Sequence, residues 1–228
     1  VVHLSSGLLD WWRGYESLFD ALVMDRSVRM RVAVGGQLDL NIAQGEVFRF
    51  ATSTLLHGDA LHLFVNSLAI LGLGRIIEPL YGGFRMLVCF SFGAVVASVG
   101  SHFVGVAQSD GASGGASTLF AMAIVLGLVY RKEWVAADRR LMGPVLWAFL
   151  GLNLLLSLVL PFVDGVGHGV GFLVGLPLGL LLPGRWKWLD RSLGTMWIGT
   201  YCFSVSFGAW WVVNGWTAER WAKYWYGP

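Results

Sequence analysis

The stretch SDGASGGAS, residues 109–117, places small and polar residues between two long apolar runs. Upstream is MLVCFSFGAVVASVG (86–100), and downstream is TLFAMAIVLGLVY (118–130). Two interpretations fit this pattern: a flexible connection between two helices, or a loop that carries a nucleophilic serine. The rest of the chain is needed to choose between them.

The composition predicts an all-α polytopic membrane protein. Of 228 residues, 56% are hydrophobic and 13% are charged, whereas soluble domains carry about 25% charged residues. The net charge is +2 and no basic run is present, so we expect no nucleic-acid partner. Cys89 and Cys202 lie inside apolar segments, which predicts packed thiols rather than a disulfide.

Six segments are long and apolar enough to be membrane-spanning helices, which need about 20 residues. The predicted spans are 60–80, 84–106, 115–130, 142–162, 166–183 and 193–215. The first is included although it carries His62, Asn66 and Arg75, because a loop would expose its apolar surface. No internal repeat was found.

The chain divides into three predicted parts. Residues 1–45 contain DWWRGYESLFDALVMDRSVRMRV (10–32), which predicts an amphipathic outer-side segment in the headgroup region. Residues 46–184 form the core, and residues 185–228 form an additional C-terminal transmembrane helix and tail.

Basic residues in the short loops predict the orientation. The loops after the first, third and fifth spans carry Arg and Lys, so they should face the cytoplasm. The loops at 102–115 and 161–169 carry neither, which places them on the exterior or periplasmic side.

Polar groups occur inside or at the start of three predicted spans, all toward the outer side. They are His62 and Asn66, four residues apart and hence on one helix face, then Ser113 and His168. Taken singly, Ser113 could be an N-cap, His168 a structural histidine, and the His–Asn pair an interhelical contact. Together they supply a nucleophile, a base and hydrogen-bond donors for an oxyanion.

Glycines surround these candidates. Gly111 and Gly114 flank Ser113, and Gly171 and Gly175 follow His168 as a small-xxx-small pair. Such pairs let helix backbones approach closely, as a base on one helix needs in order to reach a serine on another.

With these motifs in their order, residues 45–184 resemble the rhomboid family of intramembrane serine proteases. The region GEVFRFATSTLLHGDALHLFVN (45–66) contains the His-x-x-x-Asn motif, with His57 just before it. The sequences GASG (111–114) and GHGVGFLVG (167–175) resemble the serine and histidine motifs. Arg49 and Glu78 lie where the family commonly has an arginine and a glutamate, and we assign both to structural roles at opposite membrane faces.

The resemblance implies an endopeptidase that cuts peptide bonds in or near transmembrane helices. Ser113 would be the nucleophile and His168 the base, and His62, Asn66 and the Ser113 backbone N–H would form the oxyanion site. His57, Gly111, Gly114 and Gly171 would support them. No aspartate is expected to complete a triad, and no cofactor or metal is expected. The partners would be transmembrane substrates and the lipid bilayer, and the expected location is the bacterial inner membrane with the active site facing the periplasm.

The sequence departs from the family in three places. The family's first span is missing or reduced to VVHLSSGLLDWW (1–12), and the span at 193–215 is additional. Ser117 stands where the family often has an aromatic residue four positions after the serine. An alternative register makes Ser117 the nucleophile but loses the glycine that should follow it, so Ser113 is preferred.

Two other functions stay open. One is a catalytically silent rhomboid-like protein that binds membrane helices or serves in a larger membrane complex, which Ser117 favours. The other is a small transporter or channel, which predicts charged groups near the bilayer middle; almost none are found there.

Overall fold

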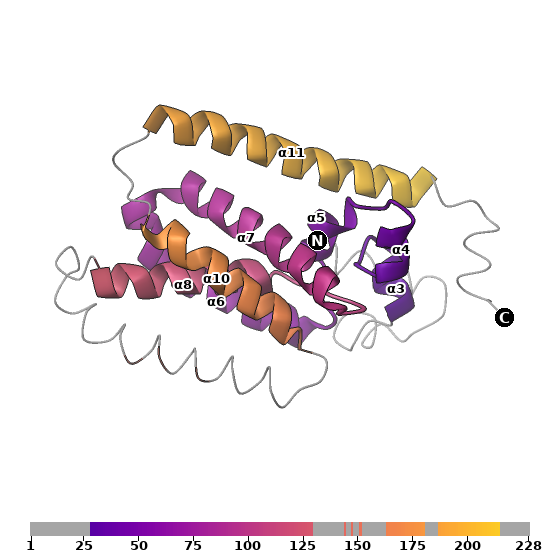
Figure 1. Ribbon diagram of the computed structural model, residues 1–228, viewed down its shortest axis with the longest axis horizontal. Coiled ribbons are helices and arrows are strands. Elements are labelled where there is room, and N and C mark those ends of the chain that lie inside the picture. Colours follow the sequence, from indigo (N-terminus) through magenta and orange to yellow (C-terminus); the bar gives the residue numbers. More distant parts are fainter. Residues whose placement is uncertain are drawn as a thin grey trace.

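The computed structural model describes residues 28–129, 163–180 and 187–214, together with the isolated helical residues 144, 147 and 151. All regular structure in these ranges is helical (Figure 1). The helices are α3 (Val28–Ala33), α4 (Asp39–Ala43), α5 (Arg49–Thr52), the 3-10 helix η1 (Ser53–Leu55), α6 (Ala60–Tyr81), α7 (Gly83–Val104), α8 (Ser113–Val129), α10 (Gly165–Leu180) and α11 (Lys187–Asn214).

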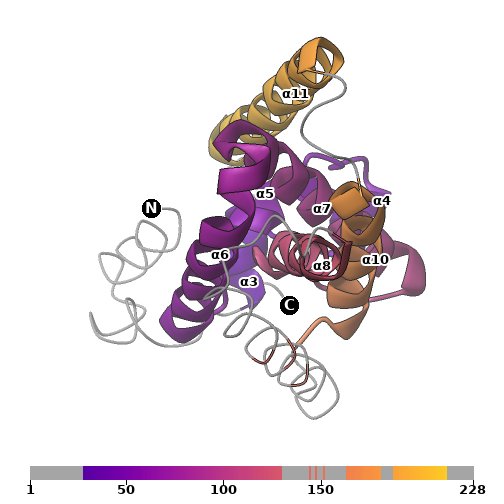
Figure 2. The same ribbon diagram turned by 90° about the vertical axis from the view of Figure 1, so that its left-hand side faces the viewer.

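Helix α8 lies at the centre of the bundle, with α6, α7 and α10 packed around it (Figure 2). Its residues 118–126 are all buried. A helix that is apolar all round is expected to be buried on every side, and the run downstream of Ser113 has that composition. The first residue of this central helix is Ser113.

Helices α8 and α10 pack in parallel through glycines. Gly171, Gly175 and Gly179 are buried on α10, and a Cβ on any of them would fall inside contact distance of α8. Their partners on α8, in the same order, are Gly114, Thr118 and Met122. Because both sets advance by four residues in the same direction, the two helices begin at the same end of the bundle.

Several segments meet at that end, which we call the site end. The N-termini of α6, α8 and α10 and the C-terminus of α7 lie there, together with residues 28–59 and the connection 105–112 (Figure 1). Backbone hydrogen bonds join the two non-helical parts: Asp39 N donates to Ala107 O and Gly111 N to Ser53 O.

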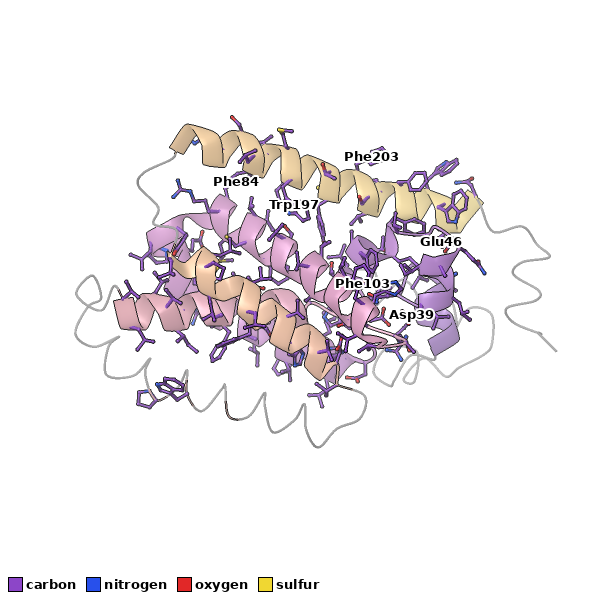
Figure 3. All side chains as sticks on the ribbon, viewed as in Figure 1. Asp39, Glu46, Phe84, Phe103, Trp197 and Phe203 are labelled. Atoms are coloured by element: carbon purple, nitrogen blue, oxygen red, sulfur yellow. The ribbon has the colours of Figure 1, made fainter. Side chains whose placement is uncertain are left out.

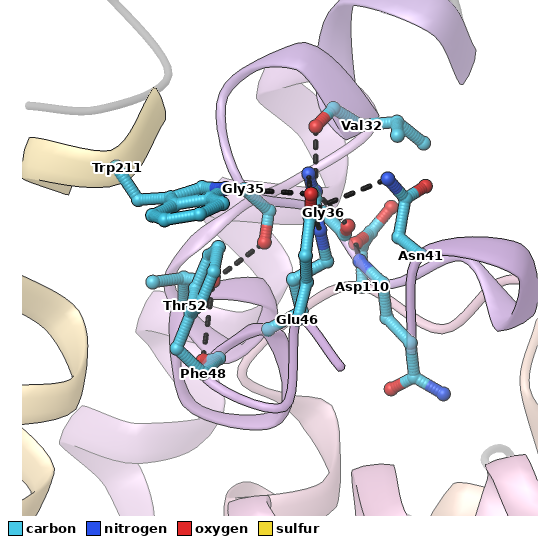
Figure 4. Close-up of polar contacts among 11 residues, drawn as sticks. Val32, Gly35, Gly36, Asn41, Glu46, Phe48, Thr52, Asp110 and Trp211 are labelled. Atoms are coloured by element: carbon cyan, nitrogen blue, oxygen red, sulfur yellow. Dashed lines mark hydrogen bonds and ion pairs between the residues drawn. The ribbon is translucent and has the colours of Figure 1, made fainter. Parts of the chain in front are cut away.

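Arg49 organises the folded segment that precedes α6, where Figure 4 shows the polar contacts around Glu46, Asn41 and Gly36. Its side chain is fully buried and donates to Val32 O at 2.6 Å, Gly36 O at 2.7 Å and Glu46 Oε2 at 2.7 Å. Glu46 also accepts from Asn41 at 3.2 Å. The guanidinium therefore ties three turns of the segment together, which is a structural role.

Glu78 lies at the opposite end of the bundle, in the last turn of α6. Gly82 N donates to the Glu78 carbonyl at 2.7 Å, and the Glu78 carboxylate lies over Gly83. Arg49 and Glu78 therefore lie at opposite ends of the bundle, as expected, and a structural role for the Glu78 side chain stays a prediction.

Helix α11 packs on the outside of α7 and α5. Trp197 lies between α11 and α7 (Figure 3), where its Nε1 donates to Ser91 Oγ at 2.9 Å. Farther along, Gly208 lies against Phe48 and Thr52. Most other α11 side chains are exposed, as expected for a helix that faces lipid on most of its circumference.

Five of the six predicted spans correspond to α6, α7, α8, α10 and α11. Helices α6 and α7 and residues 191–214 are long and apolar enough to cross a membrane, while α8 and α10 are shorter apolar helices. The predicted span 142–162 lies outside the described residues, apart from residues 144, 147 and 151. Residues 1–27 of the predicted outer segment also lie outside them.

The described part of the predicted outer segment packs into the protein. Val32, Ala33 and Gln37 are fully buried, so residues 32–37 form part of the fold at the site end instead of lying on its surface. Gln37 also bonds the Ser98 hydroxyl of α7 through its side-chain oxygen.

Candidate active site

Ser113 faces a small polar pocket at the site end. It begins α8 directly after a turn in which Gly111 has φ +123°, a conformation that favours glycine. The polar residues that line the pocket are Ser53, Thr54, Ser98, Ser109, Ser113 and Asp164. Ser117, one turn farther along α8, is not among the residues that line this pocket.

The predicted oxyanion residues lie against the backbone that leads to Ser113. A Cβ on Gly111 would be 3.1 Å from His62 Nε2 and 3.7 Å from Asn66 Nδ2. Both side chains come from the first two turns of α6. Asp59 caps the N-terminus of this helix, because its Oδ1 accepts a 2.6 Å hydrogen bond from His62 N. The absence of a side chain at residue 111 therefore leaves room for the His–Asn pair beside residues 109–113, which we call the serine loop.

The Asn66 amide is available to bind a ligand. Its side chain is 6% exposed, and among the described residues its Nδ2 has no hydrogen-bond acceptor. An unsatisfied buried donor is costly, so it needs an explanation such as a substrate oxygen or a water. His57 supports the same region, because its ring contacts the His62 ring with centroids 5.0 Å apart.

His168 lies in the first turn of α10, and its backbone N donates to Asp164 O at 3.1 Å. His168 is one turn before Gly171, and Gly171 touches the backbone of Gly114, the neighbour of Ser113. The predicted residues from α6, α8 and α10 are thus brought to one end, and direct contact between Ser113 Oγ and the His168 ring stays a prediction.

Sequence reasoning missed Asp164. No aspartate was expected at the site, but Asp164 lines the same pocket as Ser113. Its carboxylate bonds Ser101 and Ser109 and the backbone N of Gly167. The sequence did contain an indication, because an aspartate just before an apolar run is typical of a helix N-cap.

Asp110 is a second buried carboxylate near the site. It accepts hydrogen bonds from Gln37 N at 3.0 Å and Gln108 Nε2 at 2.8 Å, and Arg31 lies 3.5 Å away. Burial raises the pKa of Asp110 above its ordinary value of 3.8, and the Arg31 charge opposes that rise only in part. Asp110 links the segment before α4 to the connection 105–112, which leads into Ser113.

The raised pKa of Asp110 predicts a pH-dependent contribution to stability. Because the folded state binds this proton more tightly than the unfolded state, the contribution is fully present below the unfolded pKa of 3.8 and is lost as the pH rises through the raised pKa. Thermal unfolding midpoints of wild type and Asp110→Asn in detergent test this, with wild type gaining on the variant as the pH is lowered from 8. A difference that is constant, or that grows with pH, would contradict it.

Comparison with known proteins places this site in a family. Residues 44–185 match the rhomboid domain, which is more than half of the chain. The chain belongs to the rhomboid family. This membership and the apolar helices make it an integral membrane protein with an all-α fold.

Three relatives are named as rhomboid proteases. The rhomboid protease GluP of Bacillus subtilis is 30% identical over 137 residues, covering 60% of this chain and 26% of the relative. The putative rhomboid protease YdcA of the same organism is 28% identical over 134 residues, with coverages of 58% and 66%. The rhomboid-type serine protease 2 of Emericella nidulans is 31% identical over 153 residues, with coverages of 64% and 29%.

The rhomboid match includes every candidate site residue. It extends from just before α5 to just beyond α10, and α11 lies outside it. This chain covers between about a quarter and two thirds of the length of these three relatives.

Proposed function

We propose that this rhomboid protein is an intramembrane serine endopeptidase that cleaves transmembrane proteins with a Ser113–His168 dyad. The observation that supports this most strongly is the placement of the His62–Asn66 pair against Gly111, two residues before Ser113. The Asn66 donor, which has no acceptor among the residues that the structure describes, is then explained as part of an oxyanion site. The names of the three relatives agree with this function.

In the proposed reaction, Ser113 Oγ attacks the peptide carbonyl while His168 accepts the hydroxyl proton. The oxyanion is stabilised by His62, by Asn66 and by the backbone N–H of Ser113, and each such donor contributes about 3–4 kcal/mol in other serine hydrolases. His168 then gives the proton to the leaving amine. A water, activated by the same imidazole, hydrolyses the acyl-enzyme.

The polar pocket gives a reason for water at a membrane site. Its lining of hydroxyls and a carboxylate can hold water, whereas the lipid core has none. The substrate must present an extended backbone, because helical carbonyls are already bonded within the helix. We therefore propose substrates whose transmembrane helices unwind near the end that meets the pocket.

The proposed location is the bacterial inner membrane, with the site end facing the periplasm. The distribution of basic residues among the short loops supports this orientation, because the loops at the opposite end carry the Arg and Lys residues. The bilayer and membrane-protein substrates are the proposed partners.

Labelling with a serine-reactive fluorophosphonate tests the proposal on the purified full chain in detergent. We expect wild type and Ser117→Ala to be labelled and to cleave a reporter transmembrane substrate. Ser113→Ala and His168→Ala should lose both signals, because each removes one member of the dyad.

Two other outcomes would overturn this assignment. Labelling that survives in Ser113→Ala and disappears in Ser117→Ala would move the nucleophile to Ser117. Wild type that is folded but neither labelled nor active would favour a silent rhomboid, for which Ser117 at the usual aromatic position is the supporting observation.

A further inference from the structure

Asp164 fixes the first turn of the helix that carries His168. It lies immediately before α10, where its Oδ1 accepts a 2.8 Å hydrogen bond from Gly167 N. Its backbone carbonyl accepts from His168 N at 3.1 Å. The carboxylate therefore acts as an N-cap for α10, and the residue holds the backbone on both sides of Gly167.

The second oxygen of Asp164 makes contacts that an N-cap does not require. Oδ2 accepts from Ser109 Oγ and from Ser101 Oγ, both at 2.5 Å. Ser109 lies four residues before Ser113 in the connection to α8, and Ser101 is fully buried in the last turn of α7. Hydrogen bonds from hydroxyls to a carboxylate are short and strong, so one side chain joins α7, the serine loop and α10.

Packing around this carboxylate leaves little freedom. A Cβ on Gly167 would lie 2.6 Å from Asp164 Oδ2 and 2.9 Å from Ser101 Oγ. Gly167 is therefore needed for the approach of α10 to α7 at this level. Asp164 also lines the pocket that Ser113 faces. A displacement of its carboxylate would therefore move both the serine loop and the first turn of α10.

We propose that Asp164 is a positioning residue. It fixes the first turn of α10, which carries His168, relative to the serine loop, which leads into Ser113. The proposal rests on the proposed function, and it assigns to Asp164 no proton transfer and no contact with substrate. The joint contact with Ser109 and Gly167 carries it.

The test is the concentration dependence of fluorophosphonate inactivation, which separates the maximal rate of inactivation from the inhibitor constant. Asp164→Asn keeps an oxygen for Gly167 N, because asparagine is an equally good N-cap, but it puts an amide where Ser101 and Ser109 donate. We expect its maximal rate to fall about 10- to 100-fold, as for a misplaced catalytic group. The inhibitor constant and the thermal midpoint should stay close to those of wild type.

A double-mutant cycle shows whether Asp164 acts through Ser109. Ser109→Ala should lower the maximal rate, and the Asp164→Asn/Ser109→Ala variant should lose little more than Asp164→Asn alone. Ser67→Ala is the matched control, because this exposed serine bonds the Leu63 carbonyl of its own helix and no other group in the described part of the chain. It should leave the rate unchanged.

Three results would overturn the proposal. The first is a maximal inactivation rate in Asp164→Asn equal to that of wild type. The second is a fall in this rate that is fully explained by a lower thermal midpoint, and the third is full additivity of the rate effects of Asp164→Asn and Ser109→Ala. If wild type is labelled and Asp164→Asn is labelled at the same rate, this inference alone is overturned. If wild type is folded but is not labelled, the proposed function is overturned and this inference with it.

Discussion

Replacing Arg49 with methionine should lower the free energy of unfolding by about 3–5 kcal/mol, the usual cost of removing one partner from a buried ion pair. Arg49 Nη2 lies 2.6 Å from Glu46 Oε2, and the Arg49 side chain is fully buried. The substitution leaves the Glu46 carboxylate without its cation and removes the donor to Val32 O and Gly36 O. Asn41 and Trp211 still donate to Glu46, but neither carries a charge.

Unfolding in mixed detergent micelles, followed by tryptophan fluorescence, measures this effect. Arg75→Met is the matched control, because Arg75 is exposed on α6, and it should change the free energy by less than about 0.5 kcal/mol. The double variant Glu46→Gln/Arg49→Met should be less destabilised than the sum of its single variants. A loss below about 1 kcal/mol for Arg49→Met would contradict the structural role assigned to this arginine.

Replacing Gly171 with alanine should separate α8 from α10 and disable the site. The new Cβ would overlap the Gly114 carbonyl, which is backbone and cannot move as a flexible side chain would. The Thr118 hydroxyl bonds the Gly171 carbonyl at 2.8 Å, and this contact would be disturbed as well. We expect a loss of about 1–3 kcal/mol in stability from overpacking, and about 100-fold in fluorophosphonate labelling rate because the proposed catalytic residues move apart.

Gly169→Ala is the matched control for Gly171→Ala. Gly169 is on the same helix and is exposed, and no atom of another described helix lies within 4 Å of a Cβ built on it. This variant should label at the wild-type rate, with stability raised or unchanged because alanine is the better helix former. Equal behaviour of the two variants would show that close contact between α8 and α10 is not required.

The helices of the bundle could be predicted because long apolar runs have few alternatives in a membrane protein. A helix start close to Ser113, expected near residue 115, and the close approach of helices at Gly171 and Gly175 also followed from local sequence. Both depend on residue types at fixed spacing along one or two helices. Interactions of that kind are encoded locally, so a single sequence reveals them.

The polar connections at the site end could not be predicted in the same way. The bonds of Asp164 to Ser101 and Ser109 join residues 63 and 55 positions apart, and only the three-dimensional packing brings them together. The burial of residues 32–37 was missed for a related reason, because the charged residues just before them, such as Arg29 and Arg31, suggested a surface position for the whole segment. Inside the fold, Arg49 donates to the carbonyl of Gly36, and the backbone N of Gln37 donates to Asp110.

Residue 111 illustrates how the motif and the geometry complement each other. Sequence reasoning selected Gly111 because it lies beside a candidate serine. The structure adds that a positive φ and the proximity of the His62 ring both exclude a side chain there. That contact gives the glycine in the motif a physical reason.

The most direct test of the proposed dyad is a structure of the full chain after reaction with a fluorophosphonate, combined with peptide mapping of the adduct. The account predicts phosphorus bonded to Ser113 Oγ and a His168 ring nitrogen within hydrogen-bond distance of that oxygen. The phosphoryl oxygen should point toward His62 and the Asn66 amide. An adduct on Ser117, or one on Ser113 with packed apolar side chains between it and the His168 ring, would contradict the account.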